Sequence, residues 1–179
     1  MAGAQRGAAK GQMSSMGGTL NVLLVEDSED DALLVLRQLE KGGFLPDWER
    51  VDTAPAMEEA LKRRKWDIVL CDFRMPRFDA PAALDVLKRT GLDIPFIIVS
   101  GTIGEETAVQ AMKAGAHDYL MKGSLGRLVV AVERELREAN IRAQRRGMEE
   151  TIRESEKRFR AMVEKGADVI LLVDREGII

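Results

Sequence analysis

The chain has 179 residues, enough for one domain with its own hydrophobic core plus a linker or part of a second domain. Hydrophobic residues make up 45% and charged residues 32%, and the absence of an apolar run long enough to cross a bilayer argues against a membrane protein. The net charge of −3 argues against a general attraction to nucleic acid, and the single cysteine excludes an internal disulfide and indicates a reducing compartment, the cytoplasm.

The chain begins with a polar segment. Residues 1–19 are mostly Gly, Ala, Ser and Gln with scattered positive charges, and they lack the apolar stretch of a secretory signal. We expect a disordered leader there, either native or added for expression.

From Leu20 onward, short apolar runs alternate with amphipathic stretches, a pattern typical of βα units on a parallel sheet. Ser28 and Thr53 have the chemistry of helix N-caps, and Gly115 suits a left-handed C-cap. The predicted strands cover residues 21–25, 48–51, 67–71, 95–99 and 118–121. The predicted helices cover residues 28–42, 53–65, 81–89, 105–115 and 125–165.

The predicted strands are continuous apolar runs, as in Ile68-Val69-Leu70, which implies that helices cover both faces of the sheet. The expected fold is therefore α/β, with an open, doubly wound, five-stranded parallel sheet and an extended C-terminal helix. Ligands of such sheets bind beyond the carboxyl ends of the strands. The residues that follow each strand are thus the first candidates for chemistry.

Polar side chains follow four of the predicted strands. Glu26 and Asp27 come after the first strand, Asp72 after the third, Ser100 after the fourth and Lys122 after the fifth. Neighbouring carboxylates raise each other's pKa unless a cation compensates them, and oxygen ligands with room for water suit Mg²⁺. We therefore predict a Mg²⁺ site where the Asp72 carboxylate attacks a phosphoryl group whose charge is shared with the Lys122 ammonium.

Over residues 21–136 the chain resembles a known family, the receiver domains of two-component response regulators. The resemblance rests on Val25-Glu26-Asp27, Asp72-Phe73-Arg74-Met75-Pro76, Ser100-Gly101, Ala114-Gly115-Ala116, Asp118-Tyr119 and Lys122. It implies the flavodoxin-like strand order 2-1-3-4-5. It also implies a signalling switch that accepts a phosphoryl group on Asp72 from a histidine kinase, a phosphotransfer protein or a small phosphodonor. Such a switch is not expected to be an enzyme, since it catalyses only its own phosphoryl acceptance and dephosphorylation.

The resemblance also implies a role for each candidate residue. Ser100 would contact the phosphoryl group together with Lys122. Ser100 and Tyr119 would form the switch pair that carries the signal to the surface around the fourth helix, fifth strand and fifth helix. The implied Mg²⁺ ligands are Glu26, Asp27, Asp72 and the main-chain carbonyl of Arg74.

Three positions depart from the family pattern. Glu26 stands where Asp is common in the family. Its longer side chain could contact the metal through a water molecule instead of directly. Ala80 replaces a frequent Gly in the loop after the acceptor. Gly123 follows Lys122 where the family has Pro, which puts the usual cis peptide bond in doubt.

Simpler interpretations exist for the same residues. Asp27 alone could cap a helix, and Lys122 alone could be solvated. Ser100 before Gly101 suits a turn, and Tyr119 suits a half-buried sheet position, so only the family pattern gives these two a switch role.

Other reactive residue types receive no functional role. Cys71 lies within an apolar strand and is expected to be a small core residue. His117, the only histidine, has no second candidate ligand near it, so metal binding or phosphotransfer by it is not expected. The basic cluster Arg142, Arg145 and Arg146 is flanked by acidic residues, and we expect a solvated helix face there and no nucleic acid.

Two alternative functions stay open. Mg²⁺-dependent phosphatases with an Asp nucleophile share the doubly wound sheet, but they place two Asp two residues apart after the first strand, a spacing that Glu26-Asp27-Ser28 lacks. A pseudo-receiver would act only as a binding module. The presence of Asp72, Lys122 and Ser100 argues against that reading.

Beyond residue 138 the sequence predicts a helical linker over residues 139–165. Apolar residues there follow coiled-coil steps with a phase change near Gly147, which predicts a homodimer. Residues 154–174 resemble the entry helix and first strand of a PAS sensor domain, so residues 166–179 are expected to begin such a domain and an output domain to follow.

Overall fold

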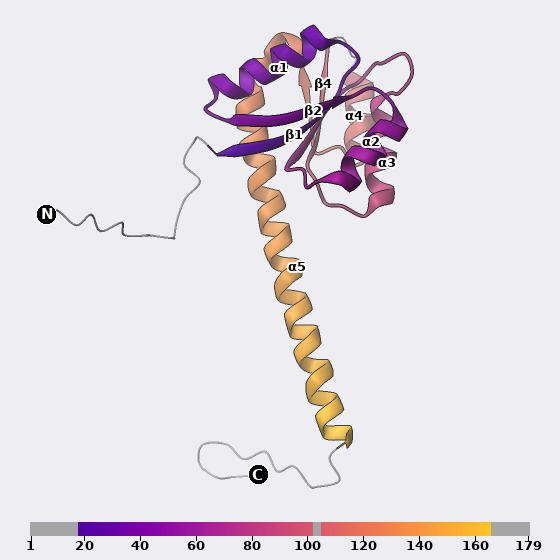
Figure 1. The fold of residues 1–179 in the computed structure, drawn as a ribbon, viewed down its shortest axis with the longest axis vertical. Helices are drawn as coiled ribbons and strands as arrows, with labels where there is room; N and C mark the ends of the chain where they lie inside the picture. The colour runs from indigo at the N-terminus through magenta and orange to yellow at the C-terminus, as the bar shows by residue number, and fades with distance from the viewer. Residues whose placement is uncertain (1–17, 102–104, 166–179) are drawn as a thin grey trace, which may run out of the picture. The chain divides into compact units, whose positions relative to one another are not determined.

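The computed structural model describes residues 18–101 and 105–165 (Figure 1). Five parallel strands form one sheet in the order β2-β1-β3-β4-β5, which confirms the predicted fold class and strand order. The strands are β1 (Thr19–Val25), β2 (Leu45–Val51), β3 (Ile68–Asp72), β4 (Phe96–Ser100) and β5 (Asp118–Met121). The helices are α1 (Glu29–Lys41), α2 (Ala54–Arg63), α3 (Ala80–Thr90), α4 (Glu105–Lys113), the 3-10 helix η1 (Lys122–Arg127) and α5 (Leu128–Lys165).

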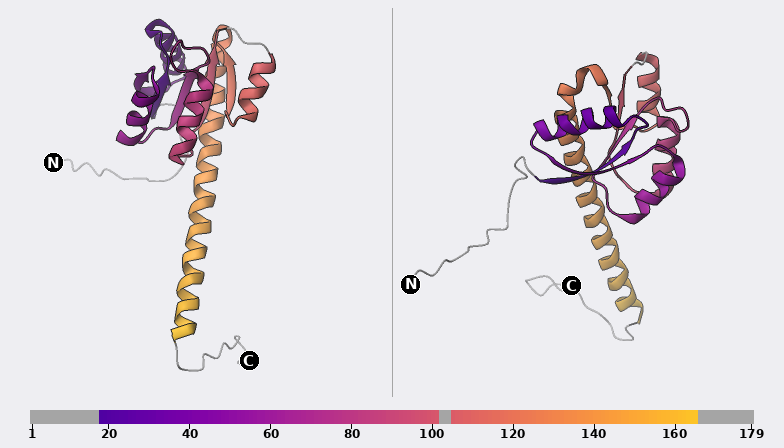
Figure 2. Two further views of the ribbon diagram at one scale, coloured as in Figure 1. Left: turned by 90° about the vertical axis from the view of Figure 1, so that its right-hand side faces the viewer. Right: turned by 45° about the horizontal axis from the view of Figure 1, so that its top comes forward.

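The sheet carries a separate hydrophobic core on each face. Successive strand residues point to opposite faces, so Leu23 and Val25 of β1 join one core while Val22 and Leu24 join the other. Residues of α2, α3 and α4 complete the first core, and residues of α1 and the start of α5 complete the second. Figure 2 shows these helices on the two sides of the sheet. This double cover explains why the central strands β1, β3 and β4 are mainly apolar without alternation.

The helix ends follow from local chemistry. The Ser28 hydroxyl accepts the N–H of Asp31 (3.3 Å) and caps α1, and the Asp79 carboxylate accepts the N–H of Ala82 (2.9 Å) and caps α3. Gly115 has φ of 99°, a left-handed conformation that other residues adopt only with strain, as expected for the C-cap that ends α4. These caps fix where each helix leaves the sheet edge.

Strand β2 differs most from its predicted bounds. It begins at Leu45 and not at residue 48, and it includes Pro46. Proline lacks a backbone N–H and is tolerated mainly at the edge of a sheet, where one side of the strand forms no ladder. Strand β2 is such an edge strand and pairs only with β1 among the described strands.

The connection after β5 also differs from the prediction. A single helix was expected from residue 125, but η1 begins at Lys122 and α5 follows at Leu128. Ser124 has a non-helical backbone conformation inside η1, which marks a kink. The described backbone contains no cis peptide bond. The peptide bond between Lys122 and Gly123 is therefore trans, in contrast to the cis bond that is usual where the family has Pro.

Helix α5 continues through Gly147 to Lys165, and the boundary between two compact units of the chain falls between Arg137 and Glu138. In the second unit several large apolar side chains are more than half exposed: Ile141, Met148, Ile152, Phe159 and Met162. The predicted leader, except its last two residues, and the predicted PAS-like strand lie outside the described residues. None of the described helices combines the length and the apolar character that a bilayer span requires.

Candidate functional site

Three carboxylates converge at the carboxyl edge of the sheet. Glu26 and Asp27 follow β1, and Asp72 is the last residue of β3, the strand beside it. One oxygen from each of the three lies within 4.8 Å of the others. Glu26 is buried, Asp72 is partly buried and Asp27 is exposed, so the cluster opens to solvent on the Asp27 side. The parallel register, in which Val25 pairs with Cys71, brings these positions together.

The cluster concentrates negative charge in a region that is partly shielded from solvent. Burial raises the pKa of Glu26, and the neighbouring Asp72 charge acts in the same direction. A hydrogen bond from Lys122 and one from the Ser28 N–H to Oε1 (3.1 Å) oppose that rise in pKa. Three oxygen donors at this spacing, with one side open to water, could hold a hard divalent cation such as Mg²⁺.

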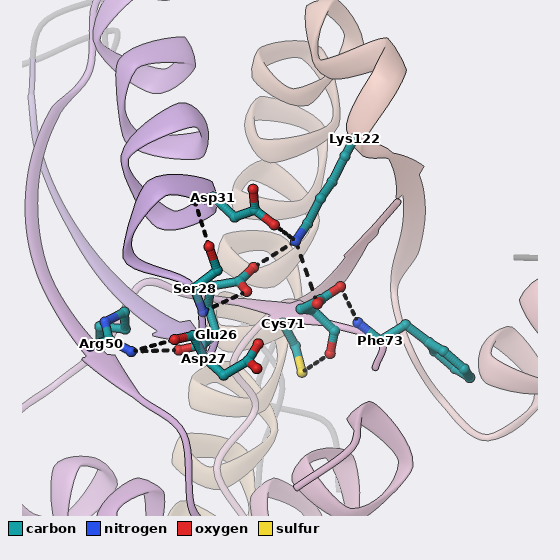
Figure 3. A network of polar contacts seen from close by, with 9 residues as sticks. Glu26, Asp27, Ser28, Asp31, Arg50, Cys71, Phe73 and Lys122 are labelled. Carbon is teal, nitrogen blue, oxygen red and sulfur yellow. Dashed lines mark hydrogen bonds and ion pairs between the residues drawn. The ribbon is translucent and has the colours of Figure 1, made fainter. Parts of the chain in front are cut away.

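Lys122 supplies the positive charge at this edge (Figure 3). Its Nζ lies 2.9 Å from Oε2 of Glu26, 2.5 Å from Oδ2 of Asp31 and 3.4 Å from Oδ2 of Asp72. Burial lowers the pKa of Lys122, but the hydrogen bonds to Asp31 and Glu26 and the nearby carboxylate charges raise it by more, so the ammonium stays charged. A fixed cation beside Asp72 can stabilise negative charge that arrives there.

Asp72 lies at the centre of this arrangement. Its Oδ1 accepts the N–H of Phe73 (2.8 Å), which leaves Oδ2 facing Lys122. Arg74 stands two residues further along the loop and is exposed, while Met75 and Phe78 of the same loop are buried in the core. These two apolar side chains anchor the loop that follows the acceptor. The role of the Arg74 carbonyl as a metal ligand stays a prediction.

Ser100 and Tyr119 lie on the two neighbouring strands. Ser100 ends β4, one residue beyond the partner of Asp72 in the sheet, and is buried. Tyr119 lies within β5, is partly buried against the first core, and donates its hydroxyl to Sδ of Met121 (3.1 Å). The structure thus places Ser100 at the same sheet edge as the carboxylates, and the switch role of the pair stays a prediction.

Two contacts at this edge were missed by the sequence reasoning. Arg50 of β2 donates from Nη1 to the main-chain oxygens of Glu26 (3.0 Å) and Asp27 (3.3 Å) and so holds the acidic turn. Asp31 of α1 forms the shortest contact of Lys122. In the sequence, Asp31 is one of three consecutive acidic residues in the first turn of α1, and no local pattern distinguishes it from Glu29 or Asp30.

Cys71 and His117 have structural roles. Cys71 is fully buried, and burial raises the pKa of its thiol well above the usual value, which agrees with a core residue. His117 accepts the N–H of Phe96 at Nδ1 (3.1 Å), at the start of β4 and therefore at the opposite end of that strand from Ser100. The histidine is thus not part of the acidic cluster.

Comparison with known proteins points to one family. Residues 22–133 match the model of the response regulator receiver domain. The transcriptional regulatory protein ZraR of Salmonella typhimurium is 34% identical over 108 residues, which cover 59% of this chain and 23% of that protein. The nitrogen assimilation regulatory protein NtrX of Azorhizobium caulinodans is 33% identical over 133 residues, which cover 73% of this chain and 29% of that protein. The chain therefore spans less than a third of the length of these relatives.

Solved structures agree with the sequence relatives. The signal receiver domain of a putative LuxO repressor protein from Vibrio parahaemolyticus matches with a TM-score of 0.62 and 25% identity, covering 70% of this chain and 96% of that one. The beryllofluoride-activated NtrC4 receiver domain dimer matches with a TM-score of 0.59 and 28% identity, covering 66% of this chain and 98% of that one.

Proposed function

The chain belongs to the response regulator receiver domain family, and we propose that it is a two-component switch that accepts a phosphoryl group on Asp72 with the help of Mg²⁺. The observation that carries this proposal is the convergence of three carboxylates and one partly buried ammonium at the carboxyl edge of the sheet. A histidine kinase or a phosphotransfer protein is the proposed donor. The proposed place of action is the cytoplasm.

In the proposed reaction, Oδ2 of Asp72 attacks the phosphorus of the donor. A bond forms between this oxygen and phosphorus while the bond from phosphorus to the donor atom breaks, and the donor leaves with the bonding electron pair. Lys122 donates an N–H to an oxygen of the transferred group. Glu26, Asp27, Asp72 and the carbonyl of Arg74 would hold Mg²⁺, whose charge offsets that of the phosphoryl oxygens.

The signal would then leave the site through β4 and β5. Ser100 is buried at the end of β4, the strand beside the acceptor strand, and a phosphoryl oxygen on Asp72 offers its hydroxyl a new acceptor. Tyr119 on the adjacent strand would move with it and change the surface formed by α4, β5 and the start of α5. We propose that residues after Arg137 pass this change to an output domain.

The position of the acceptor argues against the phosphatase alternative. Asp72 ends β3, the third strand in the chain, and its carboxylate partners are adjacent residues after β1. No reaction on an external substrate is proposed for this chain, because every candidate group of the site has a role in phosphorylation of Asp72 itself.

Removal of the metal tests the proposal directly. Wild-type protein incubated with acetyl phosphate and Mg²⁺ is expected to gain one covalent phosphate by intact mass spectrometry, and excess EDTA is expected to abolish the gain. Without a cation, the acidic cluster repels the anionic donor. Readdition of Mg²⁺ should restore phosphorylation, and an equal gain with EDTA throughout would contradict the proposal.

A pair of substitutions separates the role of the ligand from that of the ammonium. Asp27→Ala is expected to weaken Mg²⁺ binding at least about tenfold, the lower end of the loss seen even for outer-sphere partners. Lys122→Ala is expected to leave Mg²⁺ affinity equal or higher, because it removes a neighbouring positive charge, while phosphorylation becomes slower. Isothermal titration with Mg²⁺ and the mass assay measure the two effects. An equal loss of affinity in both variants would show that the assigned roles are wrong.

A further inference from the structure

Lys122 is bound more closely to α1 than to the phosphoacceptor. Its Nζ lies 2.5 Å from Asp31 and 3.4 Å from Asp72, and among the described residues it donates hydrogen bonds to Asp31 and Glu26 but not to Asp72 (Figure 3). The Lys122 side chain is 18% exposed and that of Asp31 is 36% exposed, so this ion pair is partly shielded from solvent.

Asp31 stands apart from the other carboxylates of the site. Glu26, Asp27 and Asp72 have oxygens within one 4.8 Å cluster, whereas Asp31 is not part of that cluster and contacts Lys122. A cation in the cluster would therefore neutralise the three clustered carboxylates directly. Asp31 would keep Lys122 as its counter-ion.

We propose that Asp31 is a positioning residue that restrains the Lys122 ammonium on the α1 side of the pocket and so slows phosphorylation of Asp72. This inference rests on the proposed function. When a phosphoryl group arrives, its oxygens compete with Asp31 for the same ammonium. Asp31 loses part of its ion pair and also repels the anionic donor. Both effects oppose phosphoryl acceptance, so the identity of residue 31 sets the basal rate.

The chain offers a matched control at the neighbouring position. Asp30 lies in the same first turn of α1, carries the same charge and is exposed, and its carboxylate forms no hydrogen bond or ion pair with a described residue. Asp30→Asn and Asp31→Asn remove the same charge and lose the same favourable interaction with the helix N-terminus. Only Asp31→Asn removes an ion pair with Lys122.

The first measurement is the phosphorylation rate with acetyl phosphate at saturating Mg²⁺. Asp31→Asn is expected to raise the phosphorylation rate about two- to fivefold over wild type, the size of effect expected for loss of a partly exposed ion pair. Its rate should also be higher than that of Asp30→Asn. A rate equal to that of Asp30→Asn, or a rate below wild type, would overturn the proposal, because a lower rate would mean that Asp31 holds the ammonium ready for reaction.

The second measurement follows Lys122 without any phosphodonor. The NMR signals of its ε-methylene group, identified by their loss in Lys122→Ala, are expected to shift in Asp31→Asn and to stay at wild-type positions in Asp30→Asn. Unchanged signals in both variants would overturn the restraint. If wild type is not phosphorylated at all, the proposed function fails together with the effect of Asp31 on acceptance. If wild type is phosphorylated and only the difference between the two variants is missing, the role of Asp31 alone fails.

Discussion

Asp72→Asn is expected to abolish covalent phosphorylation while the fold is retained. The amide cannot act as the nucleophile, and no other carboxylate of the cluster occupies its position at the end of β3. Intact mass spectrometry after incubation with acetyl phosphate and Mg²⁺ should show the phosphate adduct on wild type only.

The control for this experiment is Asp85→Asn. Asp85 is exposed on α3, so its substitution removes the same charge without touching the site. It should be phosphorylated like wild type. Circular dichroism should give similar thermal unfolding for all three proteins, because Asn nearly matches Asp in volume. At residue 72 the relief of repulsion within the cluster offsets the lost attraction to Lys122. A phosphate adduct on Asp72→Asn would reject this aspartate as the acceptor.

Removal of the residues after Ala139 is expected to convert a dimer into a monomer. In the second unit Met148 is 67% exposed, Ile152 60%, Phe159 55% and Met162 65%. They follow the steps of four and three that place apolar residues on one seam of a coiled coil, with Ser155 at the remaining position. Pairing would stabilise by about 25 cal/mol for each Å² of apolar surface removed from water.

Light scattering should therefore give twice the chain mass for residues 1–179 and the single-chain mass for residues 1–139. Phe159→Asp, on the seam, should weaken the full-length dimer, and Lys157→Asp, off the seam, should leave it intact. Both side chains are exposed within the described part of α5, so neither change disturbs a core. A monomeric full-length chain at micromolar concentration would contradict the coiled coil. The apolar seam would then be expected to bind a different protein.

The sequence by itself determined the class of fold and the edge of the sheet that carries the chemistry. Apolar runs without alternation require cover on both faces, and parallel strands bring all their carboxyl ends to one edge. Glu26, Asp27, Asp72 and Lys122 each stand at such an end, so their convergence follows from topology alone. Caps such as Ser28 are equally local and were equally predictable.

Local sequence patterns could not predict the bounds of the edge strand β2 or the kinked helix after β5. Strand β2 accepts Pro46 because it pairs on one side only, which depends on the strand order and not on the propensities of its own residues. The kink at Ser124 similarly depends on how the chain passes from β5 onto the second face of the sheet.

Only the tertiary structure decided the partners of the site residues. Lys122 contacts Asp31 and Glu26 across 91 and 96 residues of sequence, and Arg50 contacts the acidic turn across 24. Asp30 and Asp31 are chemically identical neighbours, and only the rotation of α1 against the sheet places one of them on the ammonium. The positions of the charges could be read from the strands, but the choice among neighbouring carboxylates is set by how the helix packs on the core.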